Sequence, residues 1–236
     1  MQHLPFLIPL LFILITFCTI SVFYFASGKQ STLLVIFLCF LVIQAILGLM
    51  GFFTQTEGIP PRLAFLVAPP FLFILGMFIF KKGHAYLDRF DIATLTILHS
   101  IRVGIEIILY ALFLYKAVPG LMTFEGRNLD IISGLTAPLV YYFGYKKRKL
   151  SNPAILTWNI LCLAILLVTV ITAILSAPTP IQQWAFDQPM IAILYFPFVW
   201  LPGIIVPIVI LSHLTAIRTL SKTFQSKKQL PLTLAN

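Results

Sequence analysis

Seven long apolar stretches, separated by short polar segments, dominate the pattern of this chain. They cover residues 4–26, 33–53, 63–80, 92–115, 127–145, 155–177 and 190–217. A helix needs roughly 20 apolar residues to cross the ~30 Å hydrocarbon core of a bilayer. The fifth stretch approaches that length only if it starts near Gly126 and takes Asp130 into the membrane. The pattern predicts an all-α bundle of seven transmembrane helices that forms a single domain over residues 1–236.

Composition agrees with a protein surrounded by the lipid bilayer. The chain is 60% hydrophobic and only 10% charged, which leaves too little polar surface to cover a soluble domain of 236 residues. The first stretch has no basic segment before it and is longer than the core of a usual signal peptide, so we expect a retained helix. The three cysteines lie in three different predicted helices and are expected to pack as small apolar residues.

Basic residues are concentrated in alternate connections between the predicted helices. One side holds twelve of them and the other side three, Arg62, Lys116 and Arg127. The twelve are Lys29, Lys81, Lys82, Arg89, Lys146, Lys147, Arg148, Lys149, Arg218, Lys222, Lys227 and Lys228. Basic residues near span ends stay in the cytoplasm, so the bias predicts an outside N-terminus and a basic cytoplasmic tail over residues 218–236, in a bacterial cytoplasmic membrane. This topology, with anionic headgroups as partners, accounts for the net charge of +9 without a nucleic-acid partner.

Prolines interrupt two of the predicted helices. The third stretch contains Pro69 and Pro70, and the seventh contains Pro197, Pro202 and Pro207. Proline removes a backbone donor and clashes with the preceding turn, so both helices should be kinked or locally unwound. Interrupted helices can mark a transporter site, although neighbouring helices also satisfy the carbonyls that proline frees in ordinary membrane helices.

Three ionisable residues, His99, Arg102 and Glu106, lie inside the fourth apolar stretch. At helical spacing they fall within about 60° of one another. An isolated charge at the membrane centre costs at least ~2.5–3.5 kcal/mol, so this stripe must face other helices or a water-filled cavity. Arg102 could pair with Glu106 one turn away or with Asp130 on the next helix.

Two interpretations of this cluster remain open. In the functional one, a polar cavity open to the outside is floored by Arg102 and walled by Glu106, Asp130 and Tyr110, and it binds a small polar or anionic ligand. In the structural one, the cluster is an interhelical clamp, with Asp130 a first-turn acid beside an Asn128 N-cap. His99 could relay protons or simply hydrogen-bond a neighbouring helix.

Several chemistries are excluded or carry no signal. A retinal protein needs a Schiff-base lysine, and no predicted span contains any lysine. The chain has no H-E-x-x-H, P-loop, G-x-S-x-G or C-x-x-C motif, and no cofactor is predicted. His84, Asp88 and Asp91 would share a helical face at the cytoplasmic boundary and are the candidates for a divalent cation. Arg89 would compete for these carboxylates, so we predict a solvated loop rather than a metal site.

A resemblance to known proteins rests on two segments. One is the run F-E-G-R-N-L-D-I-I-S-G-L-T-A-P from Phe124 to Pro138, and the other is the H-x-x-R of His99 and Arg102. Together they resemble a group of multi-pass bacterial inner-membrane proteins of unknown activity, over roughly residues 99 to 138. The shared positions here are Asp130, Gly134, Ala137 and Pro138. The resemblance implies a membrane location and treats Arg102 and Asp130 as one unit, and it implies no activity.

Three classes of function follow from these observations. The first is a transporter or binder of a small polar or anionic molecule, which predicts a polar cavity near the membrane midplane. The second is a membrane-embedded enzyme acting on a lipid or isoprenoid, which predicts a lateral opening at one leaflet with carboxylates at its mouth. In that case Glu106, Asp130 or the face formed by His84, Asp88 and Asp91 would supply the chemistry. The third is a non-catalytic scaffold or subunit, which predicts a dry, tightly packed cluster.

Overall fold

The computed structural model describes residues 4–233, with side chains up to Lys222, and contains no strand within that part of the chain. The predicted basic tail therefore lies partly outside the described residues, as do the side chains of Lys227 and Lys228. The α-helices are α1 (Leu7–Ala26), α2 (Ser31–Leu49), α3 (Leu63–Ile79), α4 (Lys81–Leu87), α5 (Ile92–Leu98), α6 (Ile101–Leu114), α7 (Asp130–Val140), α8 (Asn152–Ser176) and α9 (Val206–Thr233). Short 3₁₀ turns are η1 (Phe52–Thr54), η2 (Gly120–Met122) and η4 (Ala192–Leu194), and π-helical turns are η3 (Tyr141–Lys146) and η5 (Leu201–Ile205).

Five helices of the described chain are long and apolar enough to cross a membrane. They are Leu7–Ala26, Ser31–Leu49, Ile92–Leu114, Asn152–Ser176 and Leu201–Lys222. A sixth results if α3 and α4, which are bent by 96° relative to each other, count as one span. The fifth predicted stretch forms α7, with 11 residues, and η3, with 6, so its helix begins at Asp130 and is short. The described part of the chain is thus all-helical, with five or six helices suited to a membrane.

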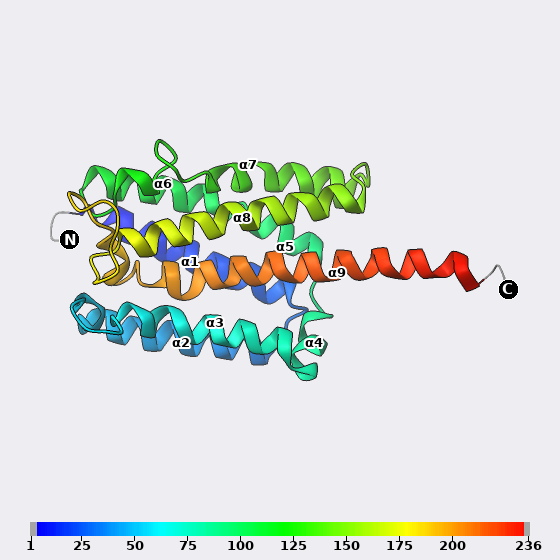
Figure 1. Ribbon diagram of the computed structural model, residues 1–236, viewed down its shortest axis with the longest axis horizontal. Coiled ribbons are helices and arrows are strands. Elements are labelled where there is room, and N and C mark those ends of the chain that lie inside the picture. Colours follow the sequence, from blue (N-terminus) through cyan, green and yellow to red (C-terminus); the bar gives the residue numbers. More distant parts are fainter. Residues whose placement is uncertain (1–3, 234–236) are drawn as a thin grey trace.

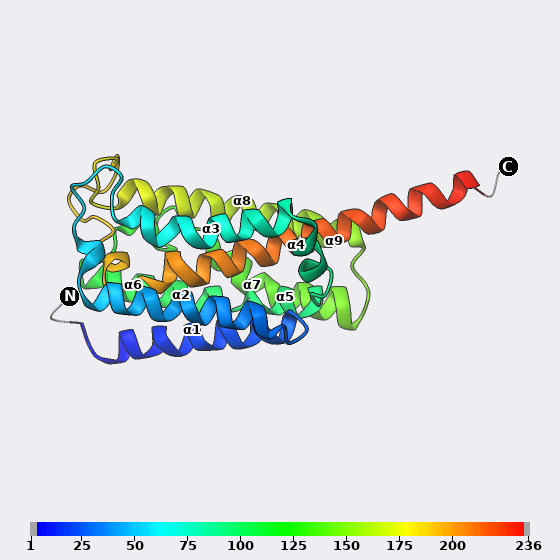
Figure 2. The ribbon, with the colours of Figure 1, turned by 90° about the horizontal axis from the view of Figure 1, so that it is seen from below.

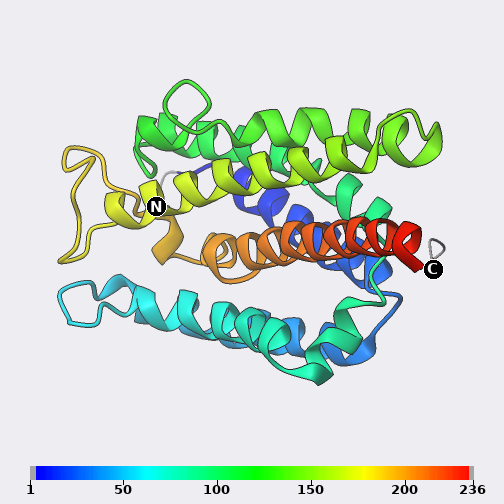
Figure 3. The same ribbon diagram turned by 45° about the vertical axis from the view of Figure 1, so that its right-hand side comes forward.

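The helices run side by side along the long axis of the molecule (Figure 1). The pair α2 and α3 lies on one side of α9 and the pair α7 and α8 on the other, with α9 in orange to red between them (Figure 3). α9 is the central helix. In its apolar stretch 72% of the residues are buried inside the protein, against 28% in α1, α2 and α8. α1 begins at one end of the bundle, and the last turns of α9 project beyond the other end (Figures 1 and 2).

The seventh predicted helix starts about eleven residues later than expected. Residues 190–200 are largely irregular, and the π-turn η5, which contains Pro202, leads into α9. The local unwinding predicted from the prolines is therefore confirmed here. Backbone N–H groups of this irregular segment hydrogen-bond to other segments. Met190 N donates to the Ser176 carbonyl at 2.8 Å, and Ala192 N donates to the Ala117 carbonyl at 2.9 Å. Such pairing is what irregular backbone requires away from water.

The third predicted helix behaves differently from the seventh. α3 continues as an α-helix through Pro69 and Pro70 to Ile79, so it is not unwound at these prolines. The break comes instead at Phe80, whose backbone is extended (φ −88°, ψ 138°). Lys81 and Lys82 follow directly, so the bend coincides with the first charged residues after the apolar stretch.

The fourth predicted helix contains a tight turn that the apolar pattern did not reveal. The backbone N–H groups of His99, Ser100, Arg102 and Val103 each donate to the carbonyl three residues earlier, at 3.0–3.3 Å. This 3₁₀-type bonding separates α5 from α6 while the two still form one apolar span, Ile92–Leu114. The turn lies at the polar stripe and sets the directions of His99 and Arg102.

Candidate functional site

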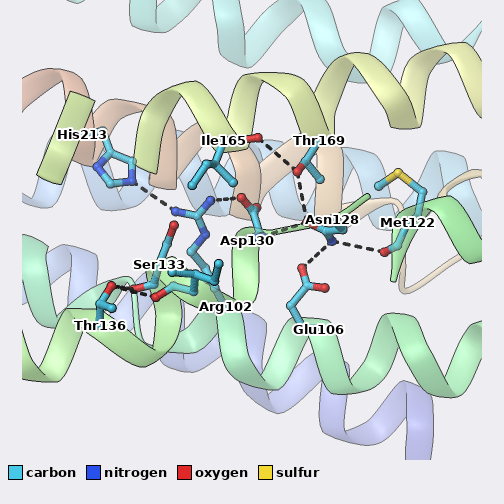
Figure 4. Close-up of polar contacts among 11 residues, drawn as sticks. Arg102, Glu106, Met122, Asn128, Asp130, Ser133, Thr136, Ile165, Thr169 and His213 are labelled. Atoms are coloured by element: carbon cyan, nitrogen blue, oxygen red, sulfur yellow. Dashed lines mark hydrogen bonds and ion pairs between the residues drawn. The ribbon is translucent and has the colours of Figure 1, made fainter. Parts of the chain in front are cut away.

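Arg102 on α6 is the centre of a buried polar network. Its side chain is only 3% exposed, and its Nη2 forms an ion pair with Oδ1 of Asp130, the first residue of α7. Its Nη1 lies 3.2 Å from Nε2 of His213 on α9 (Figure 4). A guanidinium can only donate, so Nε2 of His213 accepts this bond and the ring proton of His213 lies on Nδ1.

His213 passes the network on to a fourth helix. Its Nδ1 donates to Oδ1 of Asn159 on α8 at 3.0 Å, and Asn159 Nδ2 donates to the Ile155 carbonyl at 2.9 Å. Arg102, Asp130, His213 and Asn159 are all buried. We call these four residues the clamp, because they connect α6, α7, α8 and α9 through directional bonds without an intervening cavity.

His99 lies against the clamp but does not hydrogen-bond to it. Its ring stacks on that of His213, with centroids 3.8 Å apart and planes 11° apart, and it meets Trp158 edge-on at 5.7 Å. It is 1% exposed, and neither ring nitrogen has a hydrogen-bond partner among the described residues. The hydrogen bond to a neighbouring helix considered for His99 is therefore not made within the described residues, and the proton relay stays a prediction.

Asn128 organises the other half of the polar stripe. Its Nδ2 donates to Glu106 Oε1 at 2.6 Å and to the Met122 carbonyl at 3.2 Å. Its Oδ1 accepts from the backbone N–H of Asp130 at 3.1 Å and from Thr169 Oγ1 at 3.0 Å (Figure 4). Asn128 thus satisfies a free N–H at the start of α7, as expected of a capping side chain, and also holds Glu106 in place.

Glu106 lines a small cavity. The residue is 2% exposed, and Oε2 has no hydrogen-bond partner within the described part of the chain. Glu106, Asp130 and Thr169 form the polar part of the wall of a cavity of about 70 Å³, and the rest is apolar and comes from α3, α6, α8 and the segment 190–206. We call this space the Glu106 cavity. Of the two pairs predicted for Arg102, the structure has the one with Asp130; no ion pair with Glu106 occurs among the described residues.

A glycine allows α6 and α7 to come close enough for the Arg102–Asp130 pair. A Cβ atom placed on Gly134 would lie 2.8 Å from both the backbone nitrogen and Cγ2 of Val103, and 3.3 Å from Cβ of Arg102. Residues 123–129 before α7 are irregular and return alongside α6, so that Asn128 reaches Glu106 and Asp130 reaches Arg102. The close approach gives Gly134, one of the positions of the segment 124–138, a physical role.

Tyr110 lies apart from the other residues predicted for the site. Its ring packs on Phe124, with centroids 4.9 Å apart, and its hydroxyl hydrogen-bonds with Glu125. It does not line the Glu106 cavity. The predicted grouping therefore brings together Arg102, Glu106 and Asp130, with His99 stacked beside them, and leaves Tyr110 outside.

The three residues considered for a metal ion point to different partners. His84 Nε2 lies 2.7 Å from the Phe78 carbonyl, and Asp91 caps α5 by accepting from Thr94 N at 2.9 Å. Asp88 accepts from Arg218 Nη1 at 2.5 Å and from Lys222 Nζ at 3.1 Å. The bond from Arg218 is the main cause that lowers the pKa of Asp88. No group of three metal-binding side chains was found among the residues that the structure describes.

Sequence reasoning missed three members of the network. His213 is an ionisable residue inside the apolar stretch 190–217, so the criterion that singled out Arg102 would have found it. Asn159 and Thr169 are polar residues inside the stretch 155–177, but such residues often bond their own helix backbone, so their spacing alone gives no partner. Asn128 was expected only as a cap, and its bond to Glu106 depends on the irregular path of residues 123–129.

Comparison with known proteins adds a family but no activity. Neither the curated proteins nor the solved structures contain a match to the chain. Residues 59–221 match a domain of unknown function, DUF8737. The matched range contains every residue of the clamp and all polar residues of the Glu106 cavity. Because it covers well over half of the sequence, the chain belongs to the DUF8737 family.

Proposed function

We propose that this chain is a seven-span membrane protein, with its N-terminus outside, that binds a small molecule in the Glu106 cavity. Five or six helices have the length and apolarity of spans, and α7 with η3, which runs beside α8, supplies the remaining one. The connections that carry the predicted cytoplasmic cations, 27–30, 80–91 and 147–151, lie at the same end of the bundle (Figure 1). Their common position supports the orientation proposed from the charge bias.

The observation that carries the binding proposal is the free oxygen of Glu106. A buried acceptor without a partner costs roughly 1–3 kcal/mol, more when it is charged. Here the residue that carries that oxygen lines a cavity. A ligand that donates a hydrogen bond to Glu106 would recover this cost, so the carboxyl is placed to recognise a donor.

The ligand should carry a hydrogen-bond-donating, preferably cationic group such as a primary amine. The expectation of an anionic ligand rested on Arg102, but both terminal nitrogens of Arg102 are engaged by Asp130 and His213. The polar groups that remain toward the cavity are two carboxyls and the Thr169 hydroxyl. A second anion would meet carboxyl oxygens there, whereas an amine would find acceptors.

Within this class we favour a transporter. The π-turn η5, with Pro202, lies in the cavity wall, and the turn between α5 and α6 lies about two helical turns before Glu106. Interrupted helices that meet near the middle of a bundle are a recurrent feature of transporter binding sites. The clamp is buried and directly hydrogen-bonded, which favours a structural role for it, and it meets the cavity at Asp130.

The test uses n-butylamine and butyrate as matched small probes on the purified protein in lipid nanodiscs. A ligand that binds only the folded state raises the unfolding midpoint. We expect n-butylamine to raise it for the wild type and butyrate to leave it unchanged. In Glu106→Gln the shift should disappear, because the amide cannot replace a charge-assisted bond of about 1.5–3 kcal/mol. The control is Glu57→Gln, since Glu57 is exposed and does not line the cavity.

Stabilisation by butyrate alone, abolished in Arg102→Gln, would contradict the proposal and return Arg102 to the centre of an anion site.

A membrane-embedded enzyme acting on a lipid or isoprenoid is the second candidate, because the wall of the cavity toward α3 and α8 is apolar. It requires a second catalytic group beside Glu106, and the nearest carboxyl, Asp130, is already paired with Arg102.

A further inference from the structure

A second hollow lies beside the Glu106 cavity. This hollow has a volume of about 230 Å³ and is lined by Pro61, Leu63, Ala64, Val67, Ala68, Ile174, Thr179 and Ile181. Leu63, Val67 and Ile174 line both spaces, so the two adjoin. We call the second space the α3–α8 groove.

The groove lies between two helices that present apolar faces to their surroundings. α3 and α8 occupy the same face of the bundle on either side of α9, which runs behind them (Figures 1 and 2). Phe65 and Leu72 on α3 are exposed, as are Val168 and Ile171 on α8. In a membrane these faces contact lipid, so an opening between them leads to the bilayer rather than to water.

Polarity changes along the combined space. The groove is lined almost entirely by apolar groups, and its one polar side chain, Thr179, is buried. The inner end beside Glu106 has two carboxyls and the Thr169 hydroxyl. Ordinary ligand sites have volumes of roughly 300–1,000 Å³. The cavity alone is far smaller, whereas cavity and groove together reach the lower end of that range.

We infer that the ligand is a single-chain amphiphile that enters sideways from the bilayer through the α3–α8 groove. Its polar end, a primary amine or similar donor, binds Glu106, and its hydrocarbon chain lies between α3 and α8. The groove lies at the end of the bundle where α3 begins and α8 ends, which the charge bias places outside, so entry occurs from the outer leaflet. This inference rests on the proposed function, because it takes Glu106 as the group that binds the polar end.

The experiment uses a decylamine that carries a diazirine in its chain, added to the protein in phosphatidylcholine nanodiscs and crosslinked by light. Mass spectrometry then compares labelling of the groove with labelling of a second apolar hollow on α2, formed by Val35, Leu38, Cys39, Val42 and Ile43. We expect preferential labelling of residues on α3 and α8. Unlabelled decylamine should compete for the groove, and decanoate should not.

Two matched substitutions test the route. Val67→Trp places an indole where cavity and groove meet and should reduce groove labelling about tenfold or more, the equivalent of losing about 1.4 kcal/mol of binding. Val35→Trp makes the same change in the hollow on α2 and should leave groove labelling unchanged. Should Val67→Trp fail to fold, Ala68→Trp fills the groove from an exposed position.

The outcomes separate this inference from the proposal on which it rests. Undiminished groove labelling in folded Val67→Trp or Ala68→Trp overturns lateral entry, while n-butylamine would still stabilise the wild type if Glu106 binds a donor. Undiminished groove labelling in Glu106→Gln overturns the amphiphile bound through Glu106 and leaves a groove that takes any lipid chain. Equal labelling of groove and hollow in the wild type overturns the inference as well.

Discussion

At the scale of single residues, Arg102 shows how a charge is accommodated among four helices. Removing a charge from water costs several kcal/mol, and the cost is recovered only when its partners are well placed. Asp130 supplies the opposite charge and His213 supplies a neutral acceptor. Because the guanidinium uses both terminal nitrogens in this way, its planar fork matters as well as its charge.

Arg102→Ala should destabilise the detergent-solubilised protein by about 3–5 kcal/mol, since it leaves Asp130 as an uncompensated buried charge. Adding Asp130→Ala should cost less than the sum of the two single changes, because the second removes the group that the first orphaned. Chemical unfolding of the four proteins in this cycle gives the coupling energy. Additive losses would mean that the two side chains do not interact. Arg127→Ala, in an exposed position of the preceding loop, should stay within about 0.5 kcal/mol of the wild type.

Arg102→Lys separates a structural role from ligand recognition. A lysine ammonium keeps the charge but cannot reproduce the fork that bonds Asp130 and His213 together, so stability should fall by about 1–2 kcal/mol, the value of roughly one hydrogen bond. The stabilisation by n-butylamine should persist, because Glu106 is unchanged. Thermal unfolding with and without the probe measures both effects. Unchanged stability with lost stabilisation by the probe would instead make Arg102 a ligand-binding residue.

At the scale of helices, the contact between α6 and α7 depends on Gly134. Gly134→Ala would force a Cβ to within 2.8 Å of the Val103 backbone nitrogen, so the helices must separate and the Arg102–Asp130 pair must lengthen. We expect a loss of about 1–3 kcal/mol, as in other overpacked contacts. The control is Gly76→Ala in α3, where the nearest atom, from Phe80, would be 3.7 Å away. That change should be neutral or stabilising by up to about 1 kcal/mol, and unfolding in detergent distinguishes the two.

The contact between α4 and α9 is an exposed ionic one, and its pH dependence has a defined sign. Arg218, with Lys222, lowers the pKa of Asp88 below 3.8. A group whose pKa is lower in the folded state stabilises it above the unfolded pKa and loses that contribution as pH falls through the folded one. Asp88→Asn should therefore speed amide hydrogen exchange in α4 near neutral pH, and the difference from the wild type should vanish in strong acid and shrink at high salt. A difference that grows toward low pH would contradict this assignment.

The helices also show which parts of the structure the sequence predicts. Apolar length alone located α1, α2 and α8 to within a few residues, because a long run of apolar residues in a membrane chain has few alternatives to a helix. It did not predict the tight turn at His99 or the late start of α9. Each of these depends on which neighbouring group satisfies a backbone N–H or carbonyl, and that is decided by tertiary contacts such as Met190 with Ser176.

The candidate site was predictable to a similar degree. A charge inside an apolar stretch must find a partner, which is why Glu106 and Asp130 could be named from the sequence as the two possible partners of Arg102. The partner of a neutral polar residue is not determined in this way, so the roles of Asn128 and Asn159 appeared only with the fold. Neither the Glu106 cavity nor the α3–α8 groove could be predicted, because each is shaped by apolar side chains from helices far apart in the sequence.

At the scale of the whole molecule, the segment that matches the family contains the whole candidate site. The range 59–221 begins just before α3 and ends within α9, so it contains the clamp, the Glu106 cavity and the groove but neither α1 nor α2. α1 and α2 nevertheless pack against the rest of the bundle: Trp200 Nε1 donates to the Leu41 carbonyl at 3.0 Å, and Gln44 Nε2 donates to the Gly203 carbonyl at 3.2 Å. These bonds support the segment that leads into α9, beside the cavity.

The membrane topology decides from which leaflet the groove opens, and the position of Lys147 tests it most directly. If α7 with η3 crosses the membrane, Lys147 is cytoplasmic while Glu57 and Asp187 are outside. The test replaces each of these three exposed residues in turn by cysteine, in a variant without Cys18, Cys39 and Cys162. In intact cells an impermeant maleimide should react with the cysteine at position 57 or 187 but not with the one at position 147. After lysis the cysteine at position 147 should react as well. Labelling of Lys147 and Asp187 from the same side would mean that α8 does not separate them across the bilayer, and the seven-span arrangement would be wrong.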